Sequence, residues 1–211
     1  MSATAAGAFA ISCHHGESVD EVTPTEDLMR EHGVLRRVMY LYDEAIARLA
    51  ARHEVPFDAL AQCAAMIRRV IEDYHEKLEE QQLFPRFESA GKLVGLVATL
   101  RRQHQVGRSL TDEISTLAKA SLDDSDRDAL ASALHRFNHM YRAHAAREDT
   151  VLFPALRGLV GAAAYRELGD AFEDQEARML GERGFEHAVA DVARLEQAFG
   201  VADLAELTPS V

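Results

Sequence analysis

The chain has little of what a secreted scaffold or a membrane protein needs. Its 211 residues include no tryptophan and only two cysteines, and no apolar run approaches the ~20 residues required to cross a bilayer. Cys13 and Cys63 share no spacing motif, so we expect free thiols rather than a disulfide framework. No lysine or arginine precedes the mildly apolar N-terminal run, which disfavours a secretory signal peptide. We expect a cytoplasmic protein with no membrane partner.

Positive charge is also scarce. Lysine and arginine total 23 against 35 aspartate and glutamate residues, so the formal net charge is −12. A phosphate backbone attracts proteins through basic surfaces, and an acidic chain lacks that attraction. We therefore expect no nucleic-acid partner.

One pattern occurs twice in the chain. The first copy is His75-x-x-x-Glu79 and the second is His144-x-x-x-Glu148, and a Leu-Phe-Pro sequence follows each copy at the same distance. Positions i and i+4 of an α-helix project from the same face about one turn apart, so each pair can face a common metal ion. The repetition predicts two equivalent half-sites.

Apolar spacing at three to four residues predicts an all-α protein. Four amphipathic helices are expected over roughly 25–53, 57–85, 93–117 and 126–154, with Thr25 capping the first and the Leu-Phe-Pro prolines ending the second and fourth. Short connections favour an antiparallel up-down-up-down four-helix bundle. We assign residues 1–23 to a flexible leader, 24–158 to the bundle and 159–211 to a C-terminal helical extension.

The extension contains two further helical stretches, separated at Gly181 to Gly184. Such a segment can cover one end of the bundle, gate a pocket or form a homodimer surface. Covering one end of the bundle is the simplest of these interpretations.

Each of the four predicted helices carries one inward histidine. His32 and His104 lie on the apolar stripes of the first and third helices, beside the two His-x-x-x-Glu pairs. The expected metal ligands are His32, His75, Glu79, His104, His144 and Glu148. Six residues are too many for one tetrahedral zinc and too few to saturate two octahedral irons. If each glutamate bridges, two iron ions are held with open positions, and zinc or manganese is the fallback.

Each of these residues also has a simpler interpretation. A lone histidine on an apolar stripe is more often a hydrogen-bonded core residue than a ligand, and only the two repeats change that balance. Glu76 is either an extra ligand or a solvated helix residue, while Tyr74 and Tyr141 either pack near the site or donate a hydrogen bond into it. His139 is expected at the surface, because its spacing from His144 turns it away from the ligand row.

In these residues the chain resembles the hemerythrin-like HHE cation-binding domain. The motif of that family runs His, His-x-x-x-Glu, His, His-x-x-x-Glu through four helices, and the six expected ligands match it in order over about residues 25–157. The oxygen-carrying hemerythrins have a second histidine four residues after the third-helix histidine, where this chain has Arg108, and an aspartate in a longer spacing where it has Glu148. The resemblance is therefore to the bacterial hemerythrin-like branch.

That branch is implicated in oxygen, nitric oxide, peroxide and iron biology. The resemblance implies a non-haem di-iron protein that binds or senses a small oxidant. Two other classes stay open at this point: an iron-dependent enzyme of peroxide or nitrosative stress, and a regulatory module that responds to iron.

Overall fold

The computed structural model describes residues 22–119 and 124–209, and this part of the chain is helical with no strand. Its helices, with η marking π-helical segments, are α1 (Pro24–Ala51), α2 (Phe57–Met66), η1 (Ile67–His75), α3 (Glu76–Leu78), η2 (Glu79–Leu83), α4 (Phe84–Ser89), α5 (Val94–Leu117), α6 (Asp124–Arg147), η3 (Glu148–Leu152), α7 (Phe153–Val160), α8 (Ala162–Leu180) and α9 (Gly184–Phe199).

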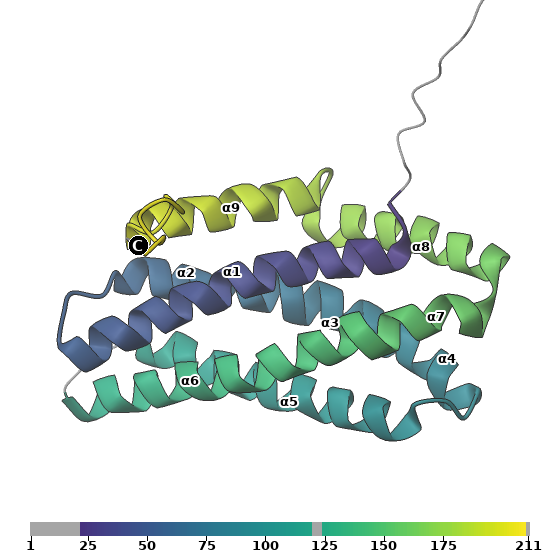
Figure 1. The fold of residues 1–211 in the computed structure, drawn as a ribbon, viewed down its shortest axis with the longest axis horizontal. Coiled ribbons are helices and arrows are strands. Elements are labelled where there is room, and N and C mark those ends of the chain that lie inside the picture. The colour runs from purple at the N-terminus through teal and green to yellow at the C-terminus, as the bar shows by residue number, and fades with distance from the viewer. Residues whose placement is uncertain (1–21, 120–123, 210–211) are drawn as a thin grey trace, which may run out of the picture.

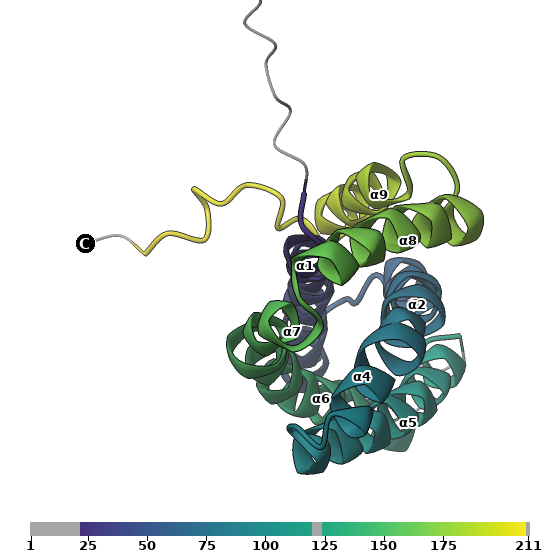
Figure 2. The ribbon, with the colours of Figure 1, turned by 90° about the vertical axis from the view of Figure 1, so that its right-hand side faces the viewer.

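Four long rods form an antiparallel up-down-up-down bundle. The first rod is α1, the second runs continuously from α2 through α4, the third is α5, and the fourth runs from α6 through α7. Seen end-on in Figure 2, the four rods surround one central axis, and α8 and α9 lie outside them against α1 and α2. Figure 1 shows α8 and α9 running along the bundle rather than capping its end. The predicted all-α bundle with a C-terminal helical extension is confirmed.

Thr23, rather than the predicted Thr25, caps the first helix. The Thr23 hydroxyl accepts a hydrogen bond from the Glu26 amide (3.4 Å), and the Glu26 carboxylate accepts one from the Thr23 amide (2.9 Å). This reciprocal capping box is compatible with Pro24, because a proline at the first helical position lacks only an amide that would have no partner in the helix. Thr25 instead lies inside the first turn.

Neither proline of the repeats ends its helix, so that prediction is wrong. The second rod continues past Pro85 to Ser89 and the fourth continues past Pro154 to Val160. A proline breaks a helix because it removes one i→i−4 hydrogen bond and its ring clashes with the preceding turn. Here a wider π turn, η2 or η3, ends shortly before each proline and already interrupts that hydrogen-bond ladder.

The buried apolar residues form two clusters along the bundle axis. On α1, Leu28 belongs to one cluster and Leu35 to the other, and the buried His32 lies between them. The same order recurs on α5, where His104 lies between the two clusters. Most of the buried polar side chains therefore form one layer between the two apolar clusters.

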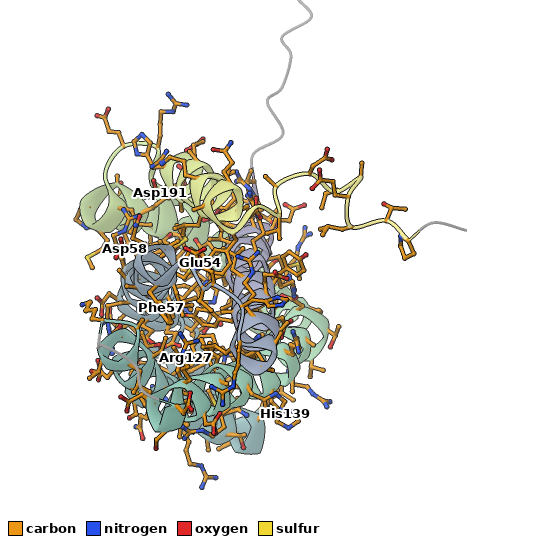
Figure 3. The ribbon with its side chains drawn as sticks, turned by 90° about the vertical axis from the view of Figure 1, so that its left-hand side faces the viewer. Glu54, Phe57, Asp58, Arg127, His139 and Asp191 are labelled. Atoms are coloured by element: carbon orange, nitrogen blue, oxygen red, sulfur yellow. The ribbon has the colours of Figure 1, made fainter. Side chains whose placement is uncertain are left out.

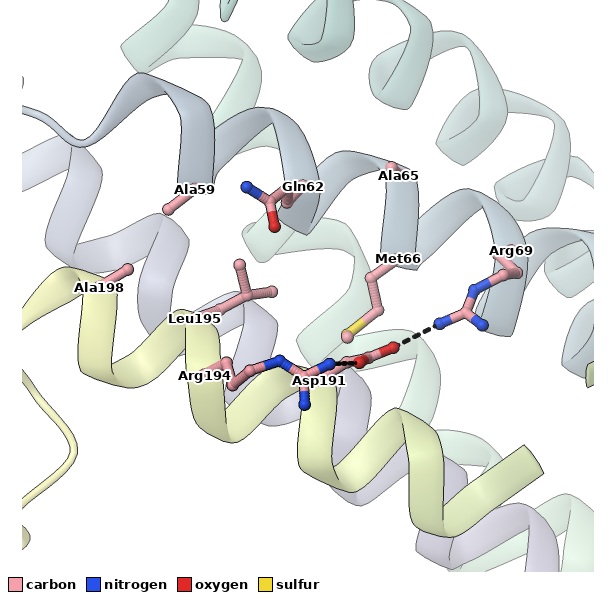
Figure 4. A pocket seen from close by; sticks show the side chains of 9 residues that line it. All are labelled: Ala59, Gln62, Ala65, Met66, Arg69, Asp191, Arg194, Leu195 and Ala198. Atoms are coloured by element: carbon pink, nitrogen blue, oxygen red, sulfur yellow. Dashed lines mark hydrogen bonds and ion pairs between the residues drawn. The ribbon is translucent and has the colours of Figure 1, made fainter. Parts of the chain in front are cut away.

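Two further contacts join helices outside the polar layer, one between α6 and α2 and one between α9 and the second rod. In Figure 3 the Arg127 guanidinium from α6 lies over the Phe57 ring of α2, 5.8 Å from its centre, and the exposed His139 lies at the periphery as expected. Between η1 and α9, Asp191 accepts a hydrogen bond from Arg69 (2.8 Å) beside a pocket, as Figure 4 shows. The α9 helix is thus tied to the second rod.

Cys63 is buried and unpaired, whereas Cys13 and most of the predicted leader lie outside the described residues. Within residues 22–119 and 124–209, every helix is too short or too polar to cross a membrane.

Candidate metal centre

The six predicted ligand residues meet in the polar layer. His32 comes from α1, His75 and Glu79 from the second rod, His104 from α5, and His144 and Glu148 from the fourth rod, and none is more than 3% exposed. Their donor atoms form two groups whose members all lie within 4.8 Å of one another: Glu79, His104, His144 and Glu148 in one group, and His32, His75 and Glu148 in the other. Glu148 belongs to both groups.

Both carboxylates lie between the two groups of histidines. The relevant contacts join Nε2 to Oε2 and measure 3.4 Å for His32 to Glu148, 3.0 Å for His144 to Glu148, 3.7 Å for His75 to Glu79, and 3.4 Å for His104 to Glu79. Each carboxylate therefore lies next to one imidazole of the His32 and His75 pair and one imidazole of the His104 and His144 pair. Glu79 and Glu148 would therefore help to hold metal ions on both sides, as the repeated motif predicts.

The opposite nitrogen of every histidine has its own partner. The Nδ1 atoms contact Asp149 (2.7 Å from His32), Glu31 (2.5 Å from His75), Glu80 (3.1 Å from His104) and Gln103 (3.0 Å from His144). An acceptor at Nδ1 holds the proton there and leaves Nε2 free to bind a metal. All four Nε2 atoms thus point into the layer as ready donors.

Sequence reasoning missed these four partners, although they follow a rule. Each is the immediate neighbour of a ligand on its own helix, and each supports the histidine of another rod. Glu31 of the first rod contacts His75 of the second, and Glu80 of the second contacts His104 of the third. Gln103 of the third contacts His144 of the fourth, and Asp149 of the fourth contacts His32 of the first. Polar residues beside every ligand were the available signal. Which helix they would reach depends on helix rotation, which the sequence pattern does not show.

All three π-helical segments in the described part of the chain border a ligand. The segment η1 ends at His75, η2 begins at Glu79 and η3 begins at Glu148. A π turn widens the helix locally and is frequent at functional sites. The widening rotates the flanking ligands relative to an ideal i, i+4 arrangement, so the site geometry is built into the backbone.

The protein atoms alone leave the layer unsatisfied. Both carboxylate oxygens of Glu79 and of Glu148, and Nε2 of His75, are buried without a hydrogen-bond partner. Burial and the charge of Glu148 raise the pKa of Glu79 well above its ordinary value, and burial raises the pKa of Glu31 to about 8. Buried carboxyls in this state need protons or cations. A pair of metal ions fits the donor set and would satisfy these atoms.

Glu76 is neither solvated nor one of the six. It is 1% exposed and accepts hydrogen bonds from the Tyr141 hydroxyl (2.6 Å) and from Arg108 (2.8 Å), and burial raises its pKa to about 8. Arg108 also donates to Glu80 (2.7 Å). Arg108, at the position where the oxygen-carrying hemerythrins have an additional histidine, therefore pairs with Glu76 and Glu80. Tyr74 packs in the apolar core.

Gly107 makes room for the Tyr141 hydroxyl, because a Cβ atom at this position would overlap it. We expect Gly107→Ala to lower the free energy of unfolding by roughly 1–3 kcal/mol, as overpacking does, and to disturb the Tyr141 to Glu76 hydrogen bond. Gly95→Ala on the same helix is the matched control, since nothing lies within 4 Å of its Cβ position. That change should be neutral or slightly stabilising. Urea unfolding of both variants measures the difference, and equal shifts would contradict the expectation.

Comparisons with known proteins agree with this geometry. The family model described as the Hemerythrin HHE cation binding domain matches residues 23–156. An uncharacterized protein of Mycobacterium tuberculosis strain H37Rv and one of Mycobacterium bovis are each 46% identical over 226 residues, covering 100% of this chain and 89% of the relative. No solved structure matches the chain. The chain belongs to the hemerythrin HHE cation-binding family.

Proposed function

We propose that this chain is a non-haem di-iron protein that binds or senses a small oxidant such as oxygen, nitric oxide or peroxide. The observation that carries the proposal is the convergence of His32, His75, Glu79, His104, His144 and Glu148 into two donor groups that share a carboxylate. Four imidazole nitrogens and two carboxylates suit divalent or trivalent iron, and they leave coordination positions open. Bound iron would supply the redox chemistry and the open positions.

The chain's own residues limit what can reach those positions. Every ligand side chain is at least 97% buried, and Phe84 and Phe153 stack against His104 and His32 with ring centroids 5.5 Å apart. A buried site walled by aromatic rings admits a diatomic molecule or peroxide more readily than a bulky substrate. The same walls exclude bulk water, which strengthens electrostatic interactions inside the layer.

An iron-dependent enzyme of peroxide or nitrosative stress is the second candidate. The observation that favours it is the polar chain from Arg108 through Glu76 to Tyr141, whose ring lies 5.4 Å from that of His144. These hydrogen-bonded side chains can hold a proton on the Glu76 carboxyl or the Tyr141 hydroxyl close to the ligands. Turnover of peroxide distinguishes an enzyme from a carrier or sensor.

Iron reconstitution tests the proposal. Protein reconstituted anaerobically with ferrous iron and then exposed to air should contain about two irons per chain and show an oxo-to-iron absorption band. His75→Ala should lose the band, while Glu113→Ala on the surface of α5 should keep it. Colourless protein with no bound iron would refute the proposal. Peroxide turnover that persists in His75→Ala would refute catalysis at this centre.

A further inference from the structure

The four outer partners of the histidines differ in charge. Glu31, Glu80 and Asp149 are carboxylates, but the partner of His144 is the neutral side-chain amide of Gln103. The amide oxygen of Gln103 lies 3.0 Å from Nδ1, so it accepts the same hydrogen bond without contributing a negative charge. One member of an otherwise acidic ring is therefore neutral.

Neighbouring cations increase this difference. Glu80 is paired with Arg108 (2.7 Å) and with Lys77 (2.8 Å), so the half of the centre near His104 and His144 has little net negative charge outside its ligands. Glu76, buried nearby, adds one carboxyl that is also paired with Arg108.

The other half keeps more of its negative charge. Asp149, behind His32, is paired with Arg36, whose side chain is 47% exposed. Glu31, behind His75, is 2% exposed, and among the described residues no lysine or arginine lies within ion-pair distance of it. Arg30 and His32 oppose this carboxylate only from beyond ion-pair distance, and a cation bound by His75 would favour its charged form.

An anionic acceptor at Nδ1 makes an imidazole a stronger electron donor at Nε2, while a neutral amide does so less. Stronger donation and nearby negative charge both favour the higher oxidation state of a bound metal. We infer that the two metal positions are electronically inequivalent: the His32 and His75 position favours the ferric ion, and the charges at Glu31 and Gln103 set the difference. This inference rests on the proposed di-iron function.

Two isosteric exchanges of opposite sign test it in the iron-loaded full chain. Stepwise reduction followed by absorption and electron paramagnetic resonance should give two midpoint potentials, the lower one belonging to the His32 and His75 position. Glu31→Gln should raise the lower potential and leave the higher one nearly unchanged. Gln103→Glu should lower the higher potential and leave the lower one nearly unchanged. Each exchange should alter the equilibrium for electron transfer between the positions roughly tenfold, which is about 59 mV for one electron.

Two further variants serve as controls for nonspecific effects of substitution on the potentials. Asp149→Asn should act in the same direction as Glu31→Gln but more weakly, because Arg36 already neutralises Asp149. Glu113→Gln, whose carboxylate pairs with Arg136 on the surface, should change neither potential.

The inference would be overturned if both potentials of the iron-loaded protein shifted together in one variant. It would also be overturned if Glu31→Gln and Gln103→Glu shifted the potentials in the same direction. Either result would leave the proposed function standing. Protein that takes up no iron would overturn the proposed function and the inference with it.

Discussion

Replacing Glu148 with alanine should abolish metal binding at both positions. Glu148 belongs to both donor groups, and its Oε2 atom lies 3.4 Å from His32 Nε2 and 3.0 Å from His144 Nε2. His75→Ala removes a ligand of one group only and should retain about one ion per chain. Metal content after reconstitution and gel filtration, measured by inductively coupled plasma mass spectrometry, separates the two results.

A folding control accompanies that experiment. Because Glu148 lies 3.4 Å from His32 and 3.0 Å from His144, its removal should also lower the stability of the metal-free protein, so the circular dichroism of both metal-free forms is measured to show that the variant is folded. Glu167→Ala, on the exposed face of α8, should bind metal as the wild type does. One ion retained by Glu148→Ala would show that this carboxylate serves a single position.

Removing the metal should lower the stability of the protein strongly and make it depend on pH. Ions that bind only the folded state, at a free concentration 1,000 times the dissociation constant, stabilise it by about 4 kcal/mol. We expect a chelated sample to have an unfolding temperature lower by roughly 8–16 °C, and its free energy of unfolding to fall between pH 7 and pH 9. Thermal and urea unfolding at several pH values measure both effects.

The direction of the pH effect follows from four raised pKa values. Burial raises the pKa of Asp27 to about 7 and those of Glu31 and Glu76 to about 8, and Asp149 and Glu148 raise the pKa of His32 to about 9 against the effect of burial. In the unfolded chain these groups release their protons at lower pH. Above pH 7 the folded state therefore binds more protons than the unfolded state, so its stability is lost as pH rises, on the order of 1 kcal/mol per unit.

Bound metal should flatten this dependence, because cations next to Glu31 and His32 replace the protons that these groups would otherwise need. The comparison of chelated and metal-loaded protein is its own control, since both contain the same residues. A metal-free protein that became more stable from pH 7 to pH 9 would contradict the assignment of the raised pKa values.

Much of the fold and all six candidate ligands were predictable from the sequence, because both depend on short spacings. A helix turns every 3.6 residues, so the pairing of His75 with Glu79 and the apolar stripe around His32 can be read from neighbouring positions. The prolines of the repeats show where this reasoning fails. Pro85 and Pro154 were expected to end their helices, but the π turns before them, which no spacing rule indicates, let the helices continue.

The sequence by itself determined the helical bundle, the inward face of each helix and the types of donor atoms at its centre. Only the tertiary structure decided which neighbour of each ligand supports which histidine, that Arg108 pairs with Glu76 and Glu80, and that Gln103 is the one neutral member of the ring. The physical reason is that contacts along a helix follow from local periodicity, whereas contacts between helices depend on their rotation and register. Those are set by the packing of the whole core.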